Sequence, residues 1–243
     1  MNLVIDIGNT RTKAALFRNE EMLENITIDN ADGSGILSFA RDKKNQIENC
    51  IVSSVNVKPF DLDELRQYIE LVLELDEYTP LPFKNKYTTS GTLGKDRIAA
   101  IAGACQLYPG RSAIIIDAGT AVTFEIKNHN EEYLGGNISP GLNMRFKALH
   151  DYTSRLPLIT YSEESGIYGT STETAINSGV YNGLLFEMNA YIELFRNKYE
   201  DLVVILTGGD AGIFENKLKK PIFVIAELTL IGLNYILKHA AKI

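Results

Sequence analysis

Leu3-Val-Ile-Asp6-Ile-Gly8-Asn9-Thr10 and Ala113-Ile-Ile-Ile-Asp117-Ala-Gly119-Thr120 are two versions of one pattern, and together they decide the fold. Each is an apolar run that ends in Asp-x-Gly, and each is followed by a second strand-forming stretch, at 13–17 and 122–126. Glycine lets a turn approach a phosphate closely, and aspartate can reach a metal ion or its waters. One such turn is usually an ordinary hairpin. Two copies, each after a buried strand and half a chain apart, instead predict two related domains that share a nucleotide cleft.

Length, net charge and cysteine content limit the classes of protein to which the chain can belong. The chain has 243 residues, enough for one large core or two domains of about 110 to 130 residues. Its net charge of -7 argues against a dedicated surface for nucleic acid or anionic membranes, although a cleft can still be locally basic. Cys50 and Cys105 lie in apolar surroundings, which predicts buried free thiols rather than a disulfide framework or a zinc site.

The sequence near the two ends of the chain does not predict a membrane-spanning or secretory segment. The N-terminus enters a strand at once, without the basic region of a signal peptide. The apolar run 221–237 is interrupted by Glu227 and Asn234, which favours a buried strand leading into a core helix over a membrane span. We therefore expect a cytoplasmic enzyme.

Hydrophobic periodicity predicts the order βββαβα in the first half, which is typical of a ribonuclease-H-like domain. The expected strands are 2–8, 12–17, 22–29 and 49–55, and the expected helices are 36–44 and 61–72. Ser53 and Ser54, at the end of the fourth strand, should face wherever the first Asp-x-Gly turn faces.

A loop at 79–94 and a helix at 96–107 complete the first half, and Tyr108-Pro-Gly-Arg111 ends it. The predicted domains are therefore 1–111 and 112–243. In the second half we expect a strand that starts at 113, further strands at 122–127, 133–139 and 202–206, and helices at 142–149 and 172–196. The last of these strands runs into a third glycine turn, Thr207-Gly-Gly209.

Gly94-Lys95-Asp96-Arg97 admits two interpretations. Asp96 could simply cap the helix beside a solvated Arg97, or it could be a general base beside an anion-binding guanidinium. Likewise, the glycines at 135–141 form either a plain hairpin and helix start, or backbone that approaches the substrate or the second domain. The competing phosphate-binding motifs, the P-loop and the Rossmann fingerprint, are absent from the sequence.

Five motifs occur in one order along the chain: Asp6-x-Gly-Asn-Thr10, Gly94-x-Asp-Arg97, Asp117-x-Gly-Thr-Ala121, Gly136-x-Ile-x-Pro-Gly-Leu142 and Thr207-Gly-Gly209. Ala148-Leu149, Thr153 and Leu156-Pro157 follow the same order. In this the chain resembles the type III pantothenate kinases, from residue 3 to about residue 232. Those enzymes belong to the actin-like superfamily that includes acetate and sugar kinases. The resemblance implies an α/β fold of two ribonuclease-H-like (actin-like ATPase) domains with a nucleotide cleft between them.

The resemblance also implies a reaction: ATP-dependent phosphorylation of pantothenate to 4'-phosphopantothenate, the first step of coenzyme A biosynthesis. It implies ATP with a divalent cation such as Mg²⁺, and a monovalent cation, K⁺ or NH₄⁺, at Asp117. Asp96 would be the catalytic base. ATP would be bound by Asp6, Ile7, Gly8, Asn9, Thr10, Arg11, Thr12, Lys13 and Thr120. Pantothenate would be bound by Tyr87, Gly94, Lys95, Asp96, Arg97 and Thr172, although Ser171 stands before Thr172 where the family commonly has Asn.

Several alternatives stay open. The chain could be a sugar or acetate kinase of the same superfamily, a non-catalytic transcription accessory relative, or an ATPase without an acceptor. We expect no nucleic-acid or membrane partner. The apolar face of helix 172–196 is either internal or part of a homodimer interface, and the resemblance favours the homodimer. Finally, the turns at Asp6 and Asp117 are expected to face each other across one cleft, with Thr207-Gly-Gly209 on its rim.

Overall fold

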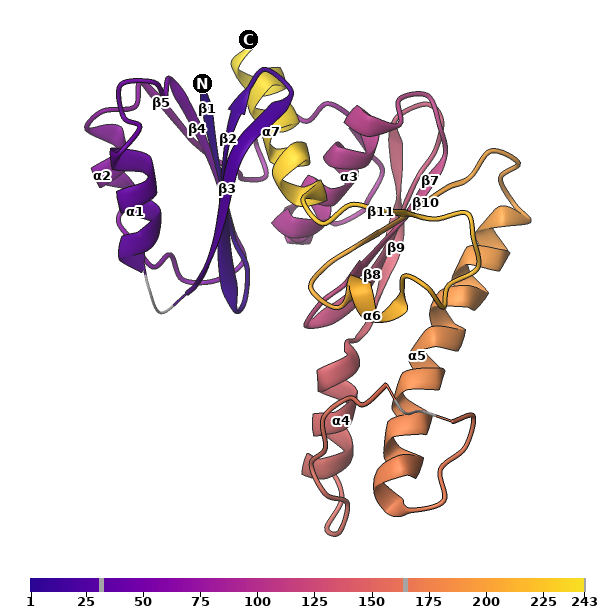
Figure 1. Cartoon of the computed structure of the whole chain (residues 1–243). Helices are drawn as coiled ribbons and strands as arrows, with labels where there is room; N and C mark the ends of the chain where they lie inside the picture. The colour runs from indigo at the N-terminus through magenta and orange to yellow at the C-terminus, as the bar shows by residue number, and fades with distance from the viewer. Residues whose placement is uncertain (31–32, 164–165, 243) are drawn as a thin grey trace. The chain divides into compact units, whose positions relative to one another are not determined.

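The computed structural model describes residues 1–30, 33–163 and 166–242, which form two compact units (Figure 1). Unit 1 contains Met1–Gly110, His129–Leu134 and Glu227–Ile243. Unit 2 contains Arg111–Asn128 and Gly135–Ala226. Each unit has its own sheet and its own apolar core.

The sheet of unit 1 has the strand order β3-β2-β1-β4-β5. Its strands are β1 (Asn2–Ile7), β2 (Arg11–Arg18), β3 (Glu21–Asp29), β4 (Asn49–Ser54) and β5 (Leu71–Glu74). Strand β1 is antiparallel to β2 and parallel to β4, and β5 runs parallel to β4. The central strands are buried on both faces, as their nearly continuous apolar sequences require.

Successive side chains of β1 point to opposite faces of this sheet, and each face packs on different helices. Leu3, Ile5 and Ile7 pack in one core with residues of α1 (Gly33–Arg41) and α2 (Leu62–Arg66). The other face carries a row of apolar residues that includes Val4, and it packs on α3 (Lys95–Leu107) and α7 (Leu228–Ala241). Asp6 lies on this second face as well, because it follows Val4 by two residues on β1.

Unit 2 repeats the topology of unit 1. Strands β7 (Ala113–Ala118) and β8 (Ala121–Lys127) are antiparallel, whereas β10 (Val203–Thr207) is parallel to β7 and β11 (Phe223–Val224) is parallel to β10. With β9 (Glu132–Pro140) beside β8, the order β9-β8-β7-β10-β11 matches β3-β2-β1-β4-β5 element for element. The predicted α/β fold of two ribonuclease-H-like halves is therefore confirmed.

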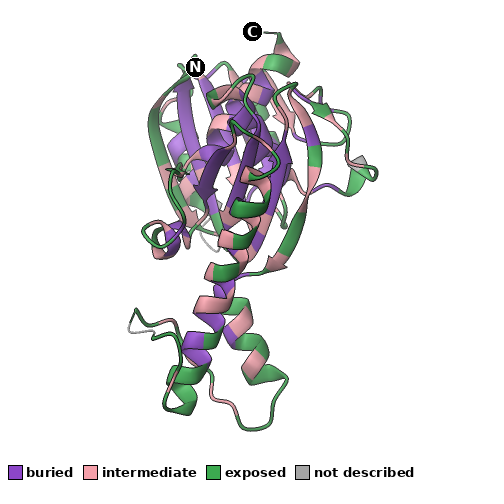
Figure 2. Ribbon diagram, turned by 90° about the vertical axis from the view of Figure 1, so that its right-hand side faces the viewer, coloured by how far each residue is buried: buried purple, intermediate pink, exposed green. Residues whose placement is uncertain are grey.

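The helices of unit 2 are α4 (Leu142–Asp151), α5 (Thr172–Arg196) and the short α6 (Ala211–Phe214). Along α5, Ile176, Val180, Leu184, Met188 and Ile192 are buried in the core of unit 2. Most of the apolar face of α5 is therefore used inside the unit. Figure 2 shows exposed residues on the parts of α4 and α5 that extend away from the sheet of this unit.

Two sequence predictions about individual elements were wrong. The helix expected at 61–72 ends at Arg66, because Leu71–Glu74 pairs with β4 as a strand. The strand expected to be buried within 221–237 is β11, and its Phe223 and Val224 are exposed at the edge of the sheet. The loop expected at 79–94 contains the two-residue β6 (Lys84–Asn85), which pairs with the start of β9, and the turn of 3₁₀ helix η1 (Ser90–Thr92).

The domain limits 1–111 and 112–243 stay a prediction. The topological repeat starts again at Ala113, but residues 129–134 and 227–243 pack in unit 1. Cys50 and Cys105 are buried free thiols, as predicted. None of the described helices combines the length and the apolar character that crossing a membrane requires.

Candidate active site

Three neighbouring strands of unit 1 place Lys13, Asp6 and Ser53 side by side. Lys13 of β2 and Ser53 of β4 are both register partners of Asp6 on β1. Residues in register on adjacent strands point to the same face of a sheet, so these three side chains form one row. The row lies on the face that α3 and α7 cover, as the residues two positions earlier on β1 and β4, Val4 and Ile51, show.

The carboxylate of Asp6 is surrounded by groups from four other elements. Burial raises its pKa, and the negative charge of Asp96 on α3 raises it further. A hydrogen bond from the Thr229 hydroxyl on α7, the nearby Ser53 hydroxyl and the charge of Lys13 all lower the pKa and oppose that increase. The charges of two predicted site residues, Asp6 and Asp96, thus influence each other although 90 positions separate them in the sequence.

The turn after β1 has its carbonyl groups tied back to the protein. The side chain of Asn30 donates to the carbonyl of Gly8 at 2.9 Å, and its N–H donates to the carbonyl of Thr10 at 3.2 Å. The side chain of Asn56 donates to the carbonyl of Asn9 at 3.2 Å. No partner for the N–H groups of Asn9 and Thr10 is found among the described residues, and both residues are exposed. Free N–H groups on an exposed glycine turn form a binding site for a phosphate.

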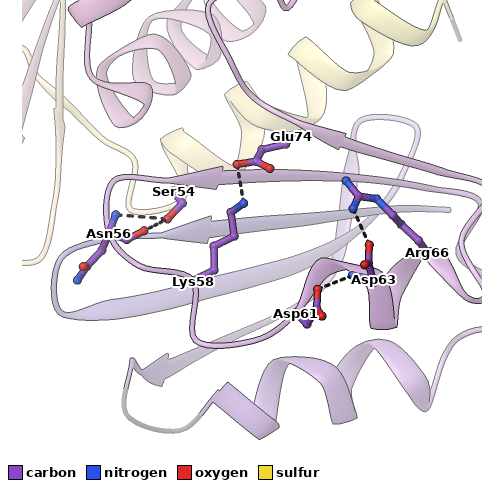
Figure 3. Close-up of polar contacts among 7 residues, drawn as sticks. All are labelled: Ser54, Asn56, Lys58, Asp61, Asp63, Arg66 and Glu74. Atoms are coloured by element: carbon purple, nitrogen blue, oxygen red, sulfur yellow. Dashed lines mark hydrogen bonds and ion pairs between the residues drawn. The ribbon is translucent and has the colours of Figure 1, made fainter.

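The loop that carries Asn56 is itself held by polar contacts (Figure 3). The Ser54 hydroxyl donates to the carbonyl of Asn56 at 2.5 Å, and the Lys58 ammonium pairs with the Glu74 carboxylate at 2.7 Å. Asp61 caps α2 by accepting from the N–H of Asp63 at 3.0 Å. These contacts fix the loop from β4 to α2, and through Asn56 they fix the first turn.

Three of the residues predicted around this turn have distinct surroundings. Thr12 is fully buried, and its hydroxyl donates to the Asn30 side chain at 2.7 Å, so it supports the turn from inside. The side chain of Ile7 lies in the core, which leaves its backbone to reach a ligand. Arg11 is exposed at the start of β2. Their contacts with ATP stay predictions.

Helix α3 begins at the Gly94-Lys95-Asp96-Arg97 motif. Gly94 is the N-cap, and Asp96 lies half-buried in the first turn, where its carboxylate accepts from the N–H of Arg97 at 2.8 Å. The interpretation of this motif as a helix cap beside a solvated arginine was therefore wrong in both details. Asp96 is not the N-cap, and Arg97 is not solvated but only 6% exposed. Asp96 instead lies in the first turn of a buried helix, and its charge raises the pKa of Asp6.

Arg97 belongs to a cluster with two tyrosines. Its guanidinium donates to the Tyr133 hydroxyl at 2.8 Å and lies 5.4 Å from the centre of the Tyr87 ring. The two tyrosine rings stack with their centres 5.9 Å apart. Tyr87 and Arg97, both predicted to contact pantothenate, are thus brought together, and Tyr133 is a member that the sequence analysis missed.

The second turn, in unit 2, is enclosed by backbone. Asp117 is the last but one residue of β7, and its register partners are Thr123 on β8 and Thr207 on β10. Gly208, with φ +96, lies so close that a Cβ there would collide with the Asp117 carboxylate and the Ala118 carbonyl. The third glycine turn therefore packs directly on the second one.

Gly141 closes the second turn from the other side. Its N–H donates to the carbonyl of Thr120 at 3.2 Å, and a Cβ at this position would collide with the carbonyls of Gly119 and Thr120. Gly141 is also the N-cap of α4, as the plain interpretation of the 135–141 loop expected, and approach of this backbone to a substrate stays a prediction. Thr120 itself is exposed at the turn.

Thr172 is the first residue of α5 and is exposed. Ser171 before it is the N-cap, and it forms a reciprocal capping box with Thr174. This explains the local sequence, because Ser and Asn are both good N-cap residues. Among the described residues no cluster of three His, Cys, Asp or Glu side chains could hold a metal ion by itself.

Solved structures with the same fold include several kinases. A ROK family glucokinase from Streptomyces griseus, solved with glucose and AMPPNP, matches with a TM-score of 0.51 at 12% identity, over 98% of this chain and 99% of that one. A Campylobacter jejuni protein provisionally described as a Baf family transcriptional activator matches with a TM-score of 0.62 at 24% identity, over 99% of this chain and 100% of that one. At these identities the matches show the fold alone.

Curated relatives are much more similar. The type III pantothenate kinase of Christiangramia forsetii is 45% identical over 238 residues, and that of Bacteroides fragilis strain ATCC 25285 is 43% identical over 239 residues. Each alignment covers 98% of both chains. The model of the type III pantothenate kinase family matches residues 2–194. The chain therefore belongs to the type III pantothenate kinase family.

Proposed function

We propose that this protein transfers a phosphoryl group from ATP to the primary hydroxyl of pantothenate, the reaction that starts coenzyme A biosynthesis. The observation that carries the proposal is that Asp6 and Asp96, on different elements of unit 1, lie near enough for the charge of Asp96 to raise the pKa of Asp6. One carboxylate adjoins a phosphate-binding turn, and the other begins a helix beside the Arg97 cluster. Phosphoryl transfer needs this division, because it combines charge neutralisation at the phosphates with a group that orients the attacking hydroxyl.

Each residue then has one role. The N–H groups of Asn9 and Thr10 and the ammonium of Lys13 bind the phosphates, as their exposure and register allow. Asp96 accepts the proton of the pantothenate hydroxyl. Arg97 and Tyr87 contact pantothenate, which is itself an anion, and Gly94 and Lys95 line the same helix start. Thr120 contacts ATP, and Thr172 contacts pantothenate.

A divalent cation such as Mg²⁺ fits beside Asp6. The fit rests on the chemistry of the residues present: a half-buried carboxylate next to the first turn, with the buried Ser53 hydroxyl beside it. When bound, the ion would neutralise charge on the transferred phosphoryl group. Asp6 would hold it together with the phosphate oxygens.

A monovalent cation, K⁺ or NH₄⁺, fits beside Asp117. The row Thr123–Asp117–Thr207 contains oxygen-bearing side chains and no basic residue, and the Ala118 carbonyl lies next to it. Oxygen atoms are the ligands that such ions prefer, and the positive charge would replace a lysine at this position.

We also propose a homodimer and a cytoplasmic location, where ATP is available. Helices α4 and α5 enclose a groove of 580 Å³ lined mainly by apolar residues, among them Ala148, Leu149 and Val180. Tyr152, 90% exposed, lies on its rim. A second copy would cover this groove through two-fold symmetry. Light scattering at micromolar concentration should give twice the chain mass, and a monomer would contradict the proposal.

The reaction is tested by coupling ADP release to a visible signal, with and without pantothenate. ADP release that requires pantothenate supports the kinase. Release without an acceptor would indicate a plain ATPase, and release driven by a sugar or acetate would indicate another kinase of the superfamily. No release under any condition would favour the non-catalytic alternative. Running each reaction in potassium and then in sodium buffer tests the monovalent cation at the same time.

A further inference from the structure

The hydroxyl of Ser53 makes no hydrogen bond of ordinary geometry among the described residues, although the side chain is fully buried and its interaction with the Asp6 carboxyl lowers the pKa of that group. Buried hydroxyl groups in folded proteins are almost always hydrogen-bonded, so this one calls for an explanation. Ser53 is the last but one residue of β4, in register with Asp6 and on the same face of the sheet.

The neighbouring hydroxyl groups have partners. Thr12 donates to the Asn30 side chain at 2.7 Å, and Ser54 donates to the carbonyl of Asn56 at 2.5 Å. Both contacts hold backbone in place, which is a structural role. Ser53 makes no such contact, and the side chain beside it is the carboxylate that adjoins the phosphate turn.

We propose that Ser53 is a positioning residue for the nucleotide's divalent cation: its hydroxyl donates to Asp6 in the nucleotide-bound protein and fixes the orientation of that carboxylate toward the ion. This inference rests on the proposed function, since it requires Asp6 to meet a metal–nucleotide complex. Thr229 already donates to Asp6 from the α7 side. Ser53 supplies a second donor from the sheet side, so the carboxylate is held between two hydroxyl groups.

Partners of metal ligands affect metal binding strongly without touching the metal. Their removal typically weakens metal affinity or activity by about 10–100-fold. A buried hydroxyl without a well-formed hydrogen bond contributes little to folding, so its replacement by hydrogen in Ser53→Ala should destabilise the protein little. The proposal thus predicts that Ser53→Ala changes metal affinity but not stability, whereas replacing a serine with a purely structural role changes stability.

The experiment measures Mn²⁺ binding in the presence of ADP, from the electron paramagnetic resonance signal of free Mn²⁺, and measures Tm without ligand. Ser53→Ala should weaken Mn²⁺ binding by about 10–100-fold while its Tm stays close to that of the unmodified protein. Ser53→Thr keeps the hydroxyl and should restore most of the affinity. If Ser53→Ala does not fold, Ser53→Cys replaces it, because it keeps the size and is a much weaker donor.

Ser178→Ala is the matched control. Ser178 is also a buried serine, 3% exposed, but its hydroxyl donates to the carbonyl of Gly166 at 2.7 Å. Its replacement should lower Tm and leave Mn²⁺ affinity unchanged. The proposal is overturned if Ser53→Ala binds Mn²⁺ within about twofold of the unmodified protein, or if Ser53→Thr binds as weakly as Ser53→Ala.

Failure of the proposed function gives a different result. If the unmodified protein binds Mn²⁺ with ADP but does not phosphorylate pantothenate, the reaction is wrong and the binding comparison still decides the role of Ser53. If it binds no Mn²⁺ with ADP at all, the metal site at Asp6, and with it this inference, is rejected.

Discussion

The two Asp-x-Gly turns share a backbone design but differ in the side chains beside them. In both, an N–H of the turn glycine closes the loop, from Gly8 to the Arg11 carbonyl at 3.0 Å and from Gly119 to the Ala121 carbonyl at 3.1 Å. The register partners of the two aspartates differ: Asp6 lies between a lysine and a serine, whereas Asp117 lies between two threonines. One repeated fold thus places different side chains beside its two aspartates, and the difference lies at two positions per sheet.

The supports of the two turns also differ. Side chains of Asn30 and Asn56 bind the carbonyls of the first turn. Backbone N–H groups of Gly141 and Asp210 bind the carbonyls of Thr120 and Ala118 in the second turn. The first turn therefore depends on individual side chains that substitution can remove, and the second depends on glycines that leave room for backbone.

The largest expected effect comes from a substitution outside both Asp-x-Gly turns, at the residue proposed to accept the proton of pantothenate. Asp96→Asn should lower kcat by about 10²–10⁴-fold, because it removes the proton acceptor but keeps the size of the side chain. Nucleotide affinity should change little, since neither turn is altered. Asp63→Asn is the control: Asp63 lies in the first turn of α2 as Asp96 lies in that of α3, but it only pairs with Arg66 on the surface. A kcat near normal in Asp96→Asn would remove Asp96 from the reaction.

The next substitution makes the row of side chains around Asp6 resemble the row around Asp117, where a threonine takes the place of the lysine. Lys13→Thr removes the cation beside Asp6 and should lower kcat/KM for ATP by about 100-fold, because a charged donor to the phosphates is lost. Lys13→Arg keeps the charge and should retain more activity. Steady-state kinetics with varied ATP measures both. If Lys13→Thr had unchanged kinetics, the difference between the two rows would have no functional meaning.

Asp117→Asn addresses the second row. It removes the negative charge that a monovalent cation would meet, so activation by potassium over sodium should fall by about tenfold or disappear. Rates are compared in potassium, ammonium and sodium buffers of equal ionic strength. The unmodified protein must show the preference for potassium or ammonium. Equal rates in all three buffers would contradict a cation site at this turn.

The smallest effect concerns stability and pH. Because burial raises the pKa of Asp6, the folded protein holds that proton more tightly than the unfolded chain. The resulting stabilisation is complete below the ordinary carboxyl pKa of about 4 and is lost as pH rises through the folded pKa. Asp6→Asn avoids that loss, so without metal or nucleotide its Tm should exceed that of the unmodified protein at neutral pH.

The excess should vanish toward acid pH, where both side chains are neutral. For a chain of this size, about 1 kcal/mol corresponds to roughly 2–4 °C in Tm, which scanning calorimetry resolves. If the Tm difference between Asp6→Asn and the unmodified protein grew as the pH fell, Asp6 would be held ionised in the folded protein. The prediction would then be contradicted.

Most of the fold could be predicted from the sequence, because the strands of both halves carry strong local patterns that end in glycine turns. The clear failure is β5. Leu65, Ile69 and Val72 continue a helical spacing, so the sequence favoured one long helix. Parallel pairing with β4 places Leu71–Glu74 in the sheet instead, and no local signal encodes that long-range pairing.

The candidate site was predictable where its residues are joined by a short hairpin or a known strand direction. Asp6 and Lys13 face each other across one hairpin, and Ser53 was expected at the same edge as the first turn. Thr229 and Tyr133 were not found, because each reaches the site from a distant element through tertiary packing. A hydroxyl or a phenol in the sequence carries no sign of such a neighbour.

Helix α7 has a consequence for how the protein is made. Leu230, Leu233, Ile236 and Leu237 of this helix pack with Val4 and Ile51 in the core of unit 1. On the ribosome, the strands of unit 1 emerge long before α7 does, and at typical rates of about 5–20 residues per second the delay is on the order of ten seconds. During that interval one apolar face of the sheet lacks the part of its cover that α7 supplies, and Asp6 lacks Thr229. The surroundings of Asp6 are therefore completed only after the second half has been translated, so a nascent chain exposes part of this face for longer than a domain built from contiguous sequence would.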